Sequence, residues 1–141
     1  MKQVNRIVIF LFLLTSCSNG IENDLYVLVE KQFRIDNCNV KFSNIIKEDW
    51  DSFYIVSEFI IPIEITDEIG IEYTGEMVKE DEYRIIFIYK NKIIKEESFF
   101  ISRIIIENEF NSGITKVSRN DSFCCEFVDV LEPSYYVLKK Q

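Results

Sequence analysis

The chain has 141 residues, of which 48% are hydrophobic and 14% aromatic, so a packed core is expected and global disorder is excluded. Its 16 basic and 24 acidic residues give a formal net charge of −8. Nucleic acids and anionic lipid surfaces are bound through basic patches, so neither is expected as a partner. The sequence contains no histidine, the commonest general base and neutral metal ligand, and we expect no metal and no cofactor.

The N-terminal residues have the order of a targeting segment. Lys2 and Arg6 precede an unbroken apolar run, residues 7–14, which is far shorter than the ~20 residues that a membrane-spanning helix needs. The run closes with residues 14–17 (LTSC) and a polar stretch follows it. An ordinary secretory signal that ends near a cysteine is one alternative. A buried N-terminal strand is the other, and the two cations before the run argue against it.

Leu14, Thr15, Ser16 and Cys17 resemble the lipobox of bacterial lipoproteins. The resemblance implies that residues 1–16 are a signal peptide, cleaved before Cys17, and that the Cys17 sulfur carries a diacylglycerol. Two or more acyl chains give stable membrane attachment, whereas one chain gives only marginal binding. We therefore expect a protein of the bacterial cell envelope that is held on a membrane through covalent lipid.

The residue after the lipidated cysteine bears on the choice of membrane. Ser18 is not the Asp that marks inner-membrane retention in some bacteria, so the outer membrane is favoured where the cell has two membranes. Cleavage would also remove Lys2 and Arg6, which leaves 14 basic against 24 acidic residues and a net charge of −10. Residues 17–24 are expected to form the lipidated cysteine and a polar spacer, and residues 25–141 a single globular domain.

Two segments have the spacing of helices. Residues 24–34 repeat apolar side chains every three or four positions, with acidic residues first and basic residues last, which suits the helix dipole. Residues 62–69 begin with a proline and are followed by a glycine, as a helix of about two turns would be. A strand is the alternative for residues 62–69, because Ile63 and Ile65 also alternate.

The remaining apolar segments are rich in aromatic and β-branched residues, which predicts strands at residues 50–59, 83–89, 92–100, 123–130 and 135–138. Lys90-Asn91 suits a tight hairpin, and the last strand could pair at a sheet edge. Residues 103–110 are a further strand or a short helix, with three β-branched isoleucines against the helix. Short connections favour antiparallel pairing. We expect an α+β domain, a mainly antiparallel sheet of five to seven strands packed by one or two helices.

Three cysteines remain besides the one assigned to lipid. Cys124 and Cys125 are neighbours on an expected strand, so their side chains point to opposite faces and a bridge between them would be strained. Cys38 could form a disulfide with either of them. The alternative is that all three are small, buried, apolar residues.

Residues 42–103 look similar to small uncharacterised bacterial lipoproteins. The similarity depends on Asp49-Trp50-Asp51 before an aromatic strand, a short segment that ends in residues 69–71 (IGI), and the hairpin that follows. Glu58-Phe59 departs from that pattern, since Pro-Tyr usually follows the first strand. The resemblance carries no known activity.

Asp49 and Asp51 are the candidate chemical groups. If Trp50 points into the core, alternation along a strand sends both carboxylates to the wet face, ~7 Å apart, where they could do acid–base work or hold calcium. The alternative is a solvated strand face or surface groove. Residues 80–82 and Glu96-Glu97 are acidic clusters, expected as solvated loops and edge-strand guards or as a patch for a basic partner.

Arg103 lies between two apolar runs, so we expect it to be partly buried and paired with a carboxylate.

These features favour a non-enzymatic binding or assembly module of the envelope, whose partner would be another envelope protein. The oligomeric state stays open. An inhibitor or immunity lipoprotein that neutralises a toxin or hydrolase is the alternative, because an acidic face suits occlusion of a basic cleft. A carboxylate-dependent hydrolase that uses Asp49 and Asp51 is the second alternative.

Overall fold

The computed structural model describes residues 20–35, 38–100, 103–107, 113–129 and 133–141. Within them lie the helices α1 (Ile21–Arg34) and α2 (Pro62–Ile69) and a short 3-10 turn, η1 (Phe42–Asn44). The strands are β1 (Asn39–Val40), β2 (Ser52–Val56), β3 (Glu82–Tyr89), β4 (Lys92–Phe100), β5 (Ile104–Glu107), β6 (Ile114–Ser118), β7 (Phe123–Val128) and β8 (Tyr135–Lys140). The predicted α+β class is confirmed. The expected signal peptide and lipobox, including Cys17, lie outside the described residues.

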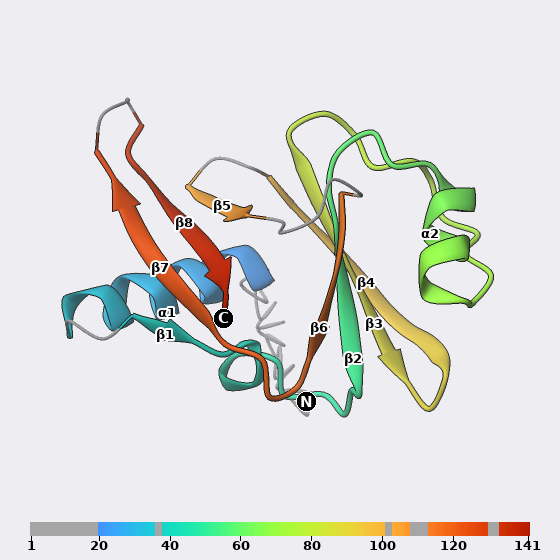
Figure 1. Cartoon of the computed structure of the whole chain (residues 1–141), viewed down its shortest axis with the longest axis horizontal. Coiled ribbons are helices and arrows are strands. Elements are labelled where there is room, and N and C mark those ends of the chain that lie inside the picture. Colours follow the sequence, from blue (N-terminus) through green and yellow to red (C-terminus); the bar gives the residue numbers. More distant parts are fainter. Residues whose placement is uncertain (1–19, 36–37, 101–102, 108–112, 130–132) are drawn as a thin grey trace, which may run out of the picture.

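The strands form two four-stranded sheets (Figure 1). Sheet A has the order β1-β7-β8-β5, and sheet B has the order β4-β3-β2-β6. The prediction of one sheet is therefore wrong, although pairing is antiparallel in every pair except β5 with β8. The parallel pair also places β8 between β7 and β5, inside sheet A. The sequence had suggested an edge position for this last strand. Ile104 lies opposite Tyr136, a contact between distant parts of the chain that local patterns do not reveal.

Helix α1 packs along sheet A and begins at Ile21, three residues before the predicted start. Ile21, Leu25 and Val29 are buried at a spacing of four residues, so one face of the helix joins the core. Residues 21–24, which were assigned to the spacer, thus belong to the helix. Of the helices in the described part of the chain, none is both long and apolar enough to cross a membrane.

Helix α2 covers the other side of sheet B and has the predicted bounds, so the alternative of a strand is wrong. Pro62 occupies the first helical position, where its missing N–H is not needed, and Gly70 ends the helix at φ 69°. The Glu64 carboxylate accepts a hydrogen bond from the Ile61 backbone N–H at 3.1 Å. Ile65 is fully buried against sheet B.

The hairpin between β3 and β4 is also confirmed. Lys90 and Asn91 have φ values of 48° and 58°, the two positive angles of a type I′ turn, which matches the twist of the flanking strands. Of the segment 103–110, the described part favours the strand over the short helix, since Ile104–Glu107 form β5. Residues 108–110 lie outside the described residues.

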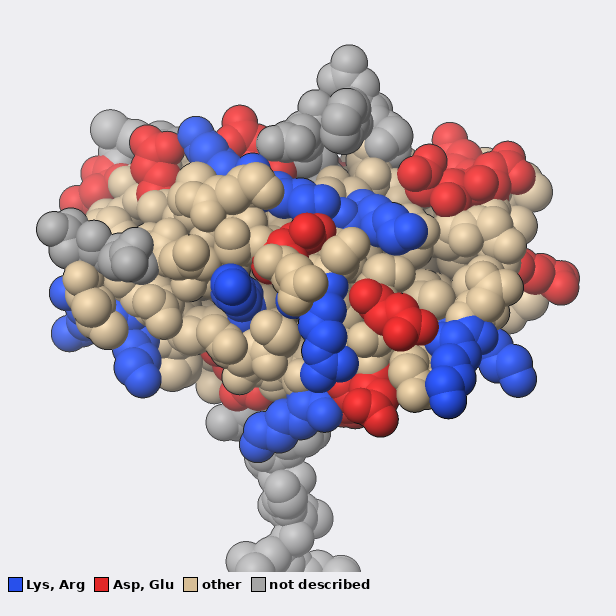
Figure 2. Space-filling model, turned by 60° about the horizontal axis from the view of Figure 1, so that its bottom comes forward, with Lys and Arg blue, Asp and Glu red and all other residues tan. Residues whose placement is uncertain are grey.

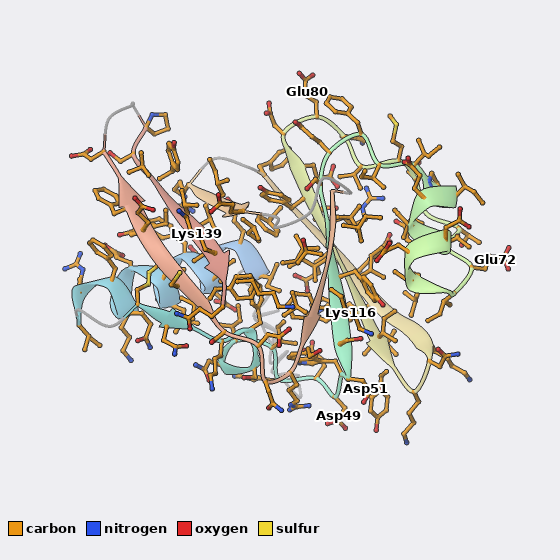
Figure 3. The ribbon with its side chains drawn as sticks, in the orientation of Figure 1. Asp49, Asp51, Glu72, Glu80, Lys116 and Lys139 are labelled. Atoms are coloured by element: carbon orange, nitrogen blue, oxygen red, sulfur yellow. A yellow bond between two sulfur atoms is a disulfide. The ribbon has the colours of Figure 1, made fainter. Side chains whose placement is uncertain are left out.

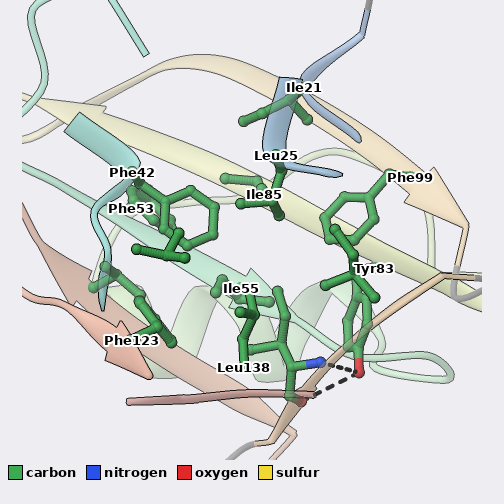
Figure 4. Close-up of a cluster of buried hydrophobic side chains, with 14 of the residues drawn as sticks. Ile21, Leu25, Phe42, Phe53, Ile55, Tyr83, Ile85, Phe99, Phe123 and Leu138 are labelled. Atoms are coloured by element: carbon green, nitrogen blue, oxygen red, sulfur yellow. Dashed lines mark hydrogen bonds between the residues drawn. The ribbon is translucent and has the colours of Figure 1, made fainter. Parts of the chain in front are cut away.

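The main core fills the space between the two sheets and is closed by α1 (Figure 4). The Phe42 ring contacts the Phe53 ring in a tilted arrangement with centroids 4.8 Å apart, and the Phe123 ring edge to face with centroids 5.4 Å apart. The Tyr83 hydroxyl of sheet B donates to the Ile106 carbonyl and accepts from the Ile106 N–H of sheet A, both at 3.2 Å. Burial raises the pKa of Tyr83, so this hydroxyl stays protonated and ties the sheets together.

A disulfide joins Cys38 to Cys125, with the two Cα atoms 5.4 Å apart. The choice between the two neighbouring cysteines follows from the alternation along β7. Cys125 faces the main core, where Cys38 arrives just before β1, whereas Cys124 points to the outer face of sheet A and is a free thiol.

A second core lies between sheet B and α2. Its buried residues are Tyr54, Val56, Ile65, Tyr73, Val78, Ile86, Ile88 and Ile114. Sheet B is therefore covered on both faces, which explains why its central strands β2 and β3 are apolar almost throughout. The covering on this side comes from residues 57–82, which leave the end of β2, form α2 and return to β3.

Candidate protein-docking site

Residues 57–82 carry the whole charge imbalance of the molecule. They contain nine carboxylates and one lysine, a formal charge of −8, which equals that of the entire chain. The other residues balance at 15 acidic and 15 basic. In Figure 2 acidic side chains gather at the upper right, toward the end of the molecule where Figure 1 places α2. We call residues 57–82 the acidic segment.

The acidic segment also exposes large apolar side chains. Phe59, Ile61, Ile63 and Met77 are 56%, 42%, 58% and 45% exposed, respectively. Single exposed apolar residues need no explanation, but several of them within one strongly charged segment are typical of a surface that binds another protein. We call these four side chains, together with the exposed carboxylates of the acidic segment, the α2 face.

Backbone hydrogen bonds bring the two halves of the α2 face together. The Phe59 N–H donates to the Val78 carbonyl at 2.8 Å, and the Val78 N–H donates to the Ile60 carbonyl at 3.1 Å. The stretches before and after α2 consequently run side by side at the top of sheet B (Figure 1). Ile60 and Val78 pack into the second core, while Phe59 and Met77 remain exposed.

The backbone of Phe59 has φ 65°, a left-handed conformation that is uncommon for a bulky residue. Such a conformation costs of order 1 kcal/mol and persists only where the surrounding structure imposes it. The phenyl ring gains little from burial in return, because more than half of it is exposed. Strain that holds an aromatic ring in solvent marks Phe59 as a candidate binding residue.

A buried ionic network fastens the acidic segment to sheet B. The Arg84 guanidinium on β3 pairs with the Glu82 carboxylate at 3.0 Å and donates to the Tyr73 hydroxyl at 2.8 Å. It also donates to the Glu76 carbonyl, next to Met77. The Tyr73 hydroxyl in turn donates to Glu96 on β4 at 2.8 Å. The loop that carries Met77 is thus held by a network within which Arg84 and Glu82 are each 7% exposed.

The protonation states of this network follow from its geometry. Burial acts to raise the pKa of Glu82, but hydrogen bonds from Ser98 and Arg84 outweigh it, and the net pKa lies below the ordinary value. Burial and the hydrogen bond to Glu96 raise the pKa of Tyr73, so its hydroxyl remains a donor at neutral pH. Gly75 leaves room for that hydroxyl, since a Cβ there would clash with it.

The acidic segment also forms one wall of a groove of about 550 Å³. Glu72 and Glu96 contribute carboxylates to the lining, Lys95 contributes one cation, and Ile93 and Ile94 contribute apolar surface. A lysine or arginine side chain from another protein suits such a groove, because its aliphatic stem is apolar and its head is cationic.

The structure separates Asp49 and Asp51 from the α2 face, since both lie at the foot of β2 (Figure 3). Glu80 belongs to the acidic segment and lies at the opposite end of sheet B. Both aspartates are exposed and Trp50 is buried, as expected, although all three precede the strand. The Asp51 carboxylate accepts from the Lys90 N–H at 2.7 Å and so stabilises the β3–β4 turn.

The expectation that Arg103 is partly buried and paired with a carboxylate is wrong. This residue is exposed, with its guanidinium carbon 4.1 Å from the centroid of the Tyr26 ring, so it packs on an aromatic face instead of being buried in an ion pair. Arg84 has the buried position that was expected of Arg103. The acidic clusters also divide, because Glu82 is buried in the network while Glu80 and Asp81 are exposed.

A larger groove of about 660 Å³ lies beside the first turn of α1. Its lining holds both signs of charge, and Lys95 pairs there with Glu48 at 3.1 Å and with Glu97. Its lining holds three carboxylates (Asp24, Glu48 and Glu97) and two lysines (Lys47 and Lys95), so most of the charge is paired inside the groove. Across the described ranges of the chain, no three cysteine, aspartate or glutamate side chains are grouped as metal ligands would be.

The sequence contained the charge signal of the α2 face but not its apolar signal. Nine carboxylates within 26 residues can be counted directly. Phe59, Ile61 and Ile63, in contrast, read as ordinary core residues, since apolar side chains are expected inside. Only the fold reveals that Val78 and Ile65 fill the second core. Phe59, Ile61 and Ile63 are left exposed at the surface.

Comparison with known proteins adds no assignment: no family model matches the chain, and neither a curated protein nor a solved structure is significantly similar to it.

Proposed function

We propose that this chain is a lipid-anchored binding module of the bacterial cell envelope, without enzymatic activity, that docks another protein through the α2 face. The observation that carries the docking function is the group of four exposed apolar side chains inside the most acidic part of the chain. Protein interfaces commonly combine an apolar centre with a charged rim. The lipid anchor rests on the lipobox-like residues 14–17.

The Cys38–Cys125 disulfide supports an envelope location. Disulfides persist in oxidising compartments such as the periplasm and the cell surface, and they are rare in the cytosol of most organisms. A pair of cysteines at bonding distance in the fold therefore agrees with export of the chain through its N-terminal signal.

Covalent geometry supports a body that lies close to the membrane. Four residue steps separate Cys17 from Ile21, the first residue of α1, and span at most ~14 Å. The first turn of α1 lies near the middle of the long axis in Figure 1, whereas α2 lies at one end of that axis. An anchor at Cys17 therefore leaves the α2 face free to meet a partner beside the lipoprotein.

The carboxylate pair is better explained by structure than by catalysis. Asp51 is engaged with the Lys90 N–H, and neither Asp49 nor Asp51 lines either of the two grooves described above. A hydrolase would need an accessible acid and base that both face a substrate. We therefore do not retain the two aspartates as catalytic residues.

The anchor and the docking function can be tested together in the Cys17→Ala variant. We expect the processed protein to move from the membrane to the soluble envelope fraction, because ordinary secretory cleavage accepts the small alanine but no lipid can be attached. By size-exclusion chromatography it should elute with its partner as a complex larger than the monomer.

Ile63→Ser in the Cys17→Ala background should release the monomer. Ile35→Ser is the matched control, because Ile35 is exposed to a similar extent (62%) but lies at the end of α1, away from the α2 face, and it should leave the complex intact. A Cys17→Ala protein that stays on membranes contradicts the anchor. A monomer in all three variants contradicts docking.

A further inference from the structure

We infer that the partner of the α2 face is a cationic protein surface, with lysine and arginine side chains arranged around an apolar pocket. This inference rests on the proposed docking function and specifies its partner by chemistry. Nucleic acids and anionic lipids are excluded as occupants, because a segment with a formal charge of −8 repels both.

The charges of the α2 face are available to a partner. Lys79 is the one basic residue of the acidic segment, so most of its nine carboxylates have no cation from the same segment. Arg84 neutralises Glu82 inside the network, but Glu64, Asp67, Glu68, Glu72, Glu76, Glu80 and Asp81 are exposed or half-buried at the surface. Clustered like charges repel one another, and a cationic partner relieves that repulsion.

The apolar side chains define the other half of the partner. Phe59 and Ile63 are each more than half exposed, and they would be buried on contact. On a flat basic surface these two side chains would lie against charged groups. An apolar pocket between the basic residues would instead bury them. Burying an aromatic and an aliphatic anchor supplies most of the affinity in typical interfaces, while the charged rim supplies attraction and specificity.

The α2 face is held in place before a partner arrives. The Phe59 backbone is fixed by its N–H hydrogen bond to the Val78 carbonyl, and the loop at Glu76 is fixed by the hydrogen bond from the Arg84 guanidinium to the Glu76 carbonyl. Residues 57–82 thus form an ordered surface with little entropy to lose on binding. This combination suits occlusion of a basic cleft, as an inhibitor or immunity protein would require, and it suits an assembly contact equally well.

Three synthetic peptides serve as probes for the purified full-length lipoprotein in detergent micelles: an amphipathic Lys/Leu peptide, its Lys/Ser analogue and its Glu/Leu analogue. We expect the Lys/Leu peptide to bind, the Lys/Ser analogue to bind ~10-fold more weakly, and the Glu/Leu analogue not to bind. Raising the salt concentration from about 50 mM to 500 mM should weaken the Lys/Leu affinity at least about tenfold, since exposed charges are screened.

Matched variants distinguish binding of the peptide at the α2 face from nonspecific attraction of a cationic peptide to an acidic protein. Glu68→Lys with Glu72→Lys, and Asp24→Lys with Asp49→Lys, change the net charge equally, but only the first pair lies in the acidic segment. The first pair should weaken Lys/Leu binding at least about tenfold, and the second by less than about twofold.

Phe59→Gly should also weaken binding while the protein stays folded, because glycine adopts φ 65° without strain. Circular dichroism of each variant checks the fold.

Equal losses in the two charge-reversal pairs would overturn the inference, and so would binding that does not respond to salt. Its failure is distinguishable from failure of the docking function. If Ile63→Ser releases the native partner while both charge-reversal pairs retain it, docking stands and the cationic partner class is wrong.

Discussion

Removal of the Cys38–Cys125 disulfide should lower the free energy of unfolding by about 4–5 kcal/mol. The bridge closes a loop with a sequence separation of 87 residues, and the entropy of the unfolded chain predicts a cost of that size. The variant Cys38→Ala with Cys125→Ala removes both thiols, so no mispairing with Cys124 can occur. Urea denaturation followed by tryptophan fluorescence measures the effect through Trp50, which is buried in the main core.

Cys124→Ala is the matched control for the disulfide. Its half-buried thiol makes one weak contact, to the Lys139 carbonyl at 3.5 Å, so we expect a change below about 1 kcal/mol. Reduction of the wild type should shift its denaturation midpoint to that of the double variant. Equal stability of the oxidised and reduced wild type would contradict the role of the bridge.

Arg84→Met should destabilise the protein by about 3–5 kcal/mol at pH 7. The substitution leaves the Glu82 carboxylate buried without its cation, which costs far more than the net value of an intact pair. The control Arg34→Met removes an exposed pair with Glu30 on α1, worth at most about 0.5 kcal/mol. Urea denaturation of the two variants measures both effects, and equal losses would contradict the buried network.

The cost of Arg84→Met should shrink as the pH falls. In the wild type the pKa of Glu82 is below its unfolded value near 4.5, so the stability it contributes is present above that pH and lost as the pH falls through the folded pKa. In the variant, burial without Arg84 instead favours the protonated carboxyl. The difference in unfolding free energy between wild type and variant should therefore be largest near pH 7 and smaller below about pH 4.5. Replacing Glu82 by Leu in the same variant should recover part of the loss at pH 7, because no buried charge then remains unpaired.

Local features of the sequence predicted local structure well. Pro62 and Gly70 bound α2 because each fits one helix end, and the Lys90-Asn91 hairpin was predicted because Asn tolerates positive φ. These signals act within a few residues. Pairing between distant strands has no such signal, so the parallel contact of β5 with β8, and with it the division into two sheets, was not predicted.

The environment of the arginines shows the same limit. Arg84 and Arg103 each stand directly before a run of apolar residues, and nothing in the neighbouring sequence distinguishes the two. Arg84 is buried because the acidic segment returns across sheet B and places Glu76 and Tyr73 over it. Arg103 has no such cover and stacks on Tyr26. Burial of a charged residue is thus decided by the tertiary fold, and the ionic network that orders the candidate site could not be foreseen.

The most direct measurement of the central claim is site-specific photocrosslinking of the lipoprotein in living cells. A benzophenone amino acid placed at Ile63 should crosslink one partner protein, and the same group at Ile35 should not, although both positions are exposed to a similar extent. The crosslink should disappear when Glu68→Lys and Glu72→Lys are added. Equal crosslinking from both positions, or none from position 63, would contradict the assignment of the α2 face as the docking surface.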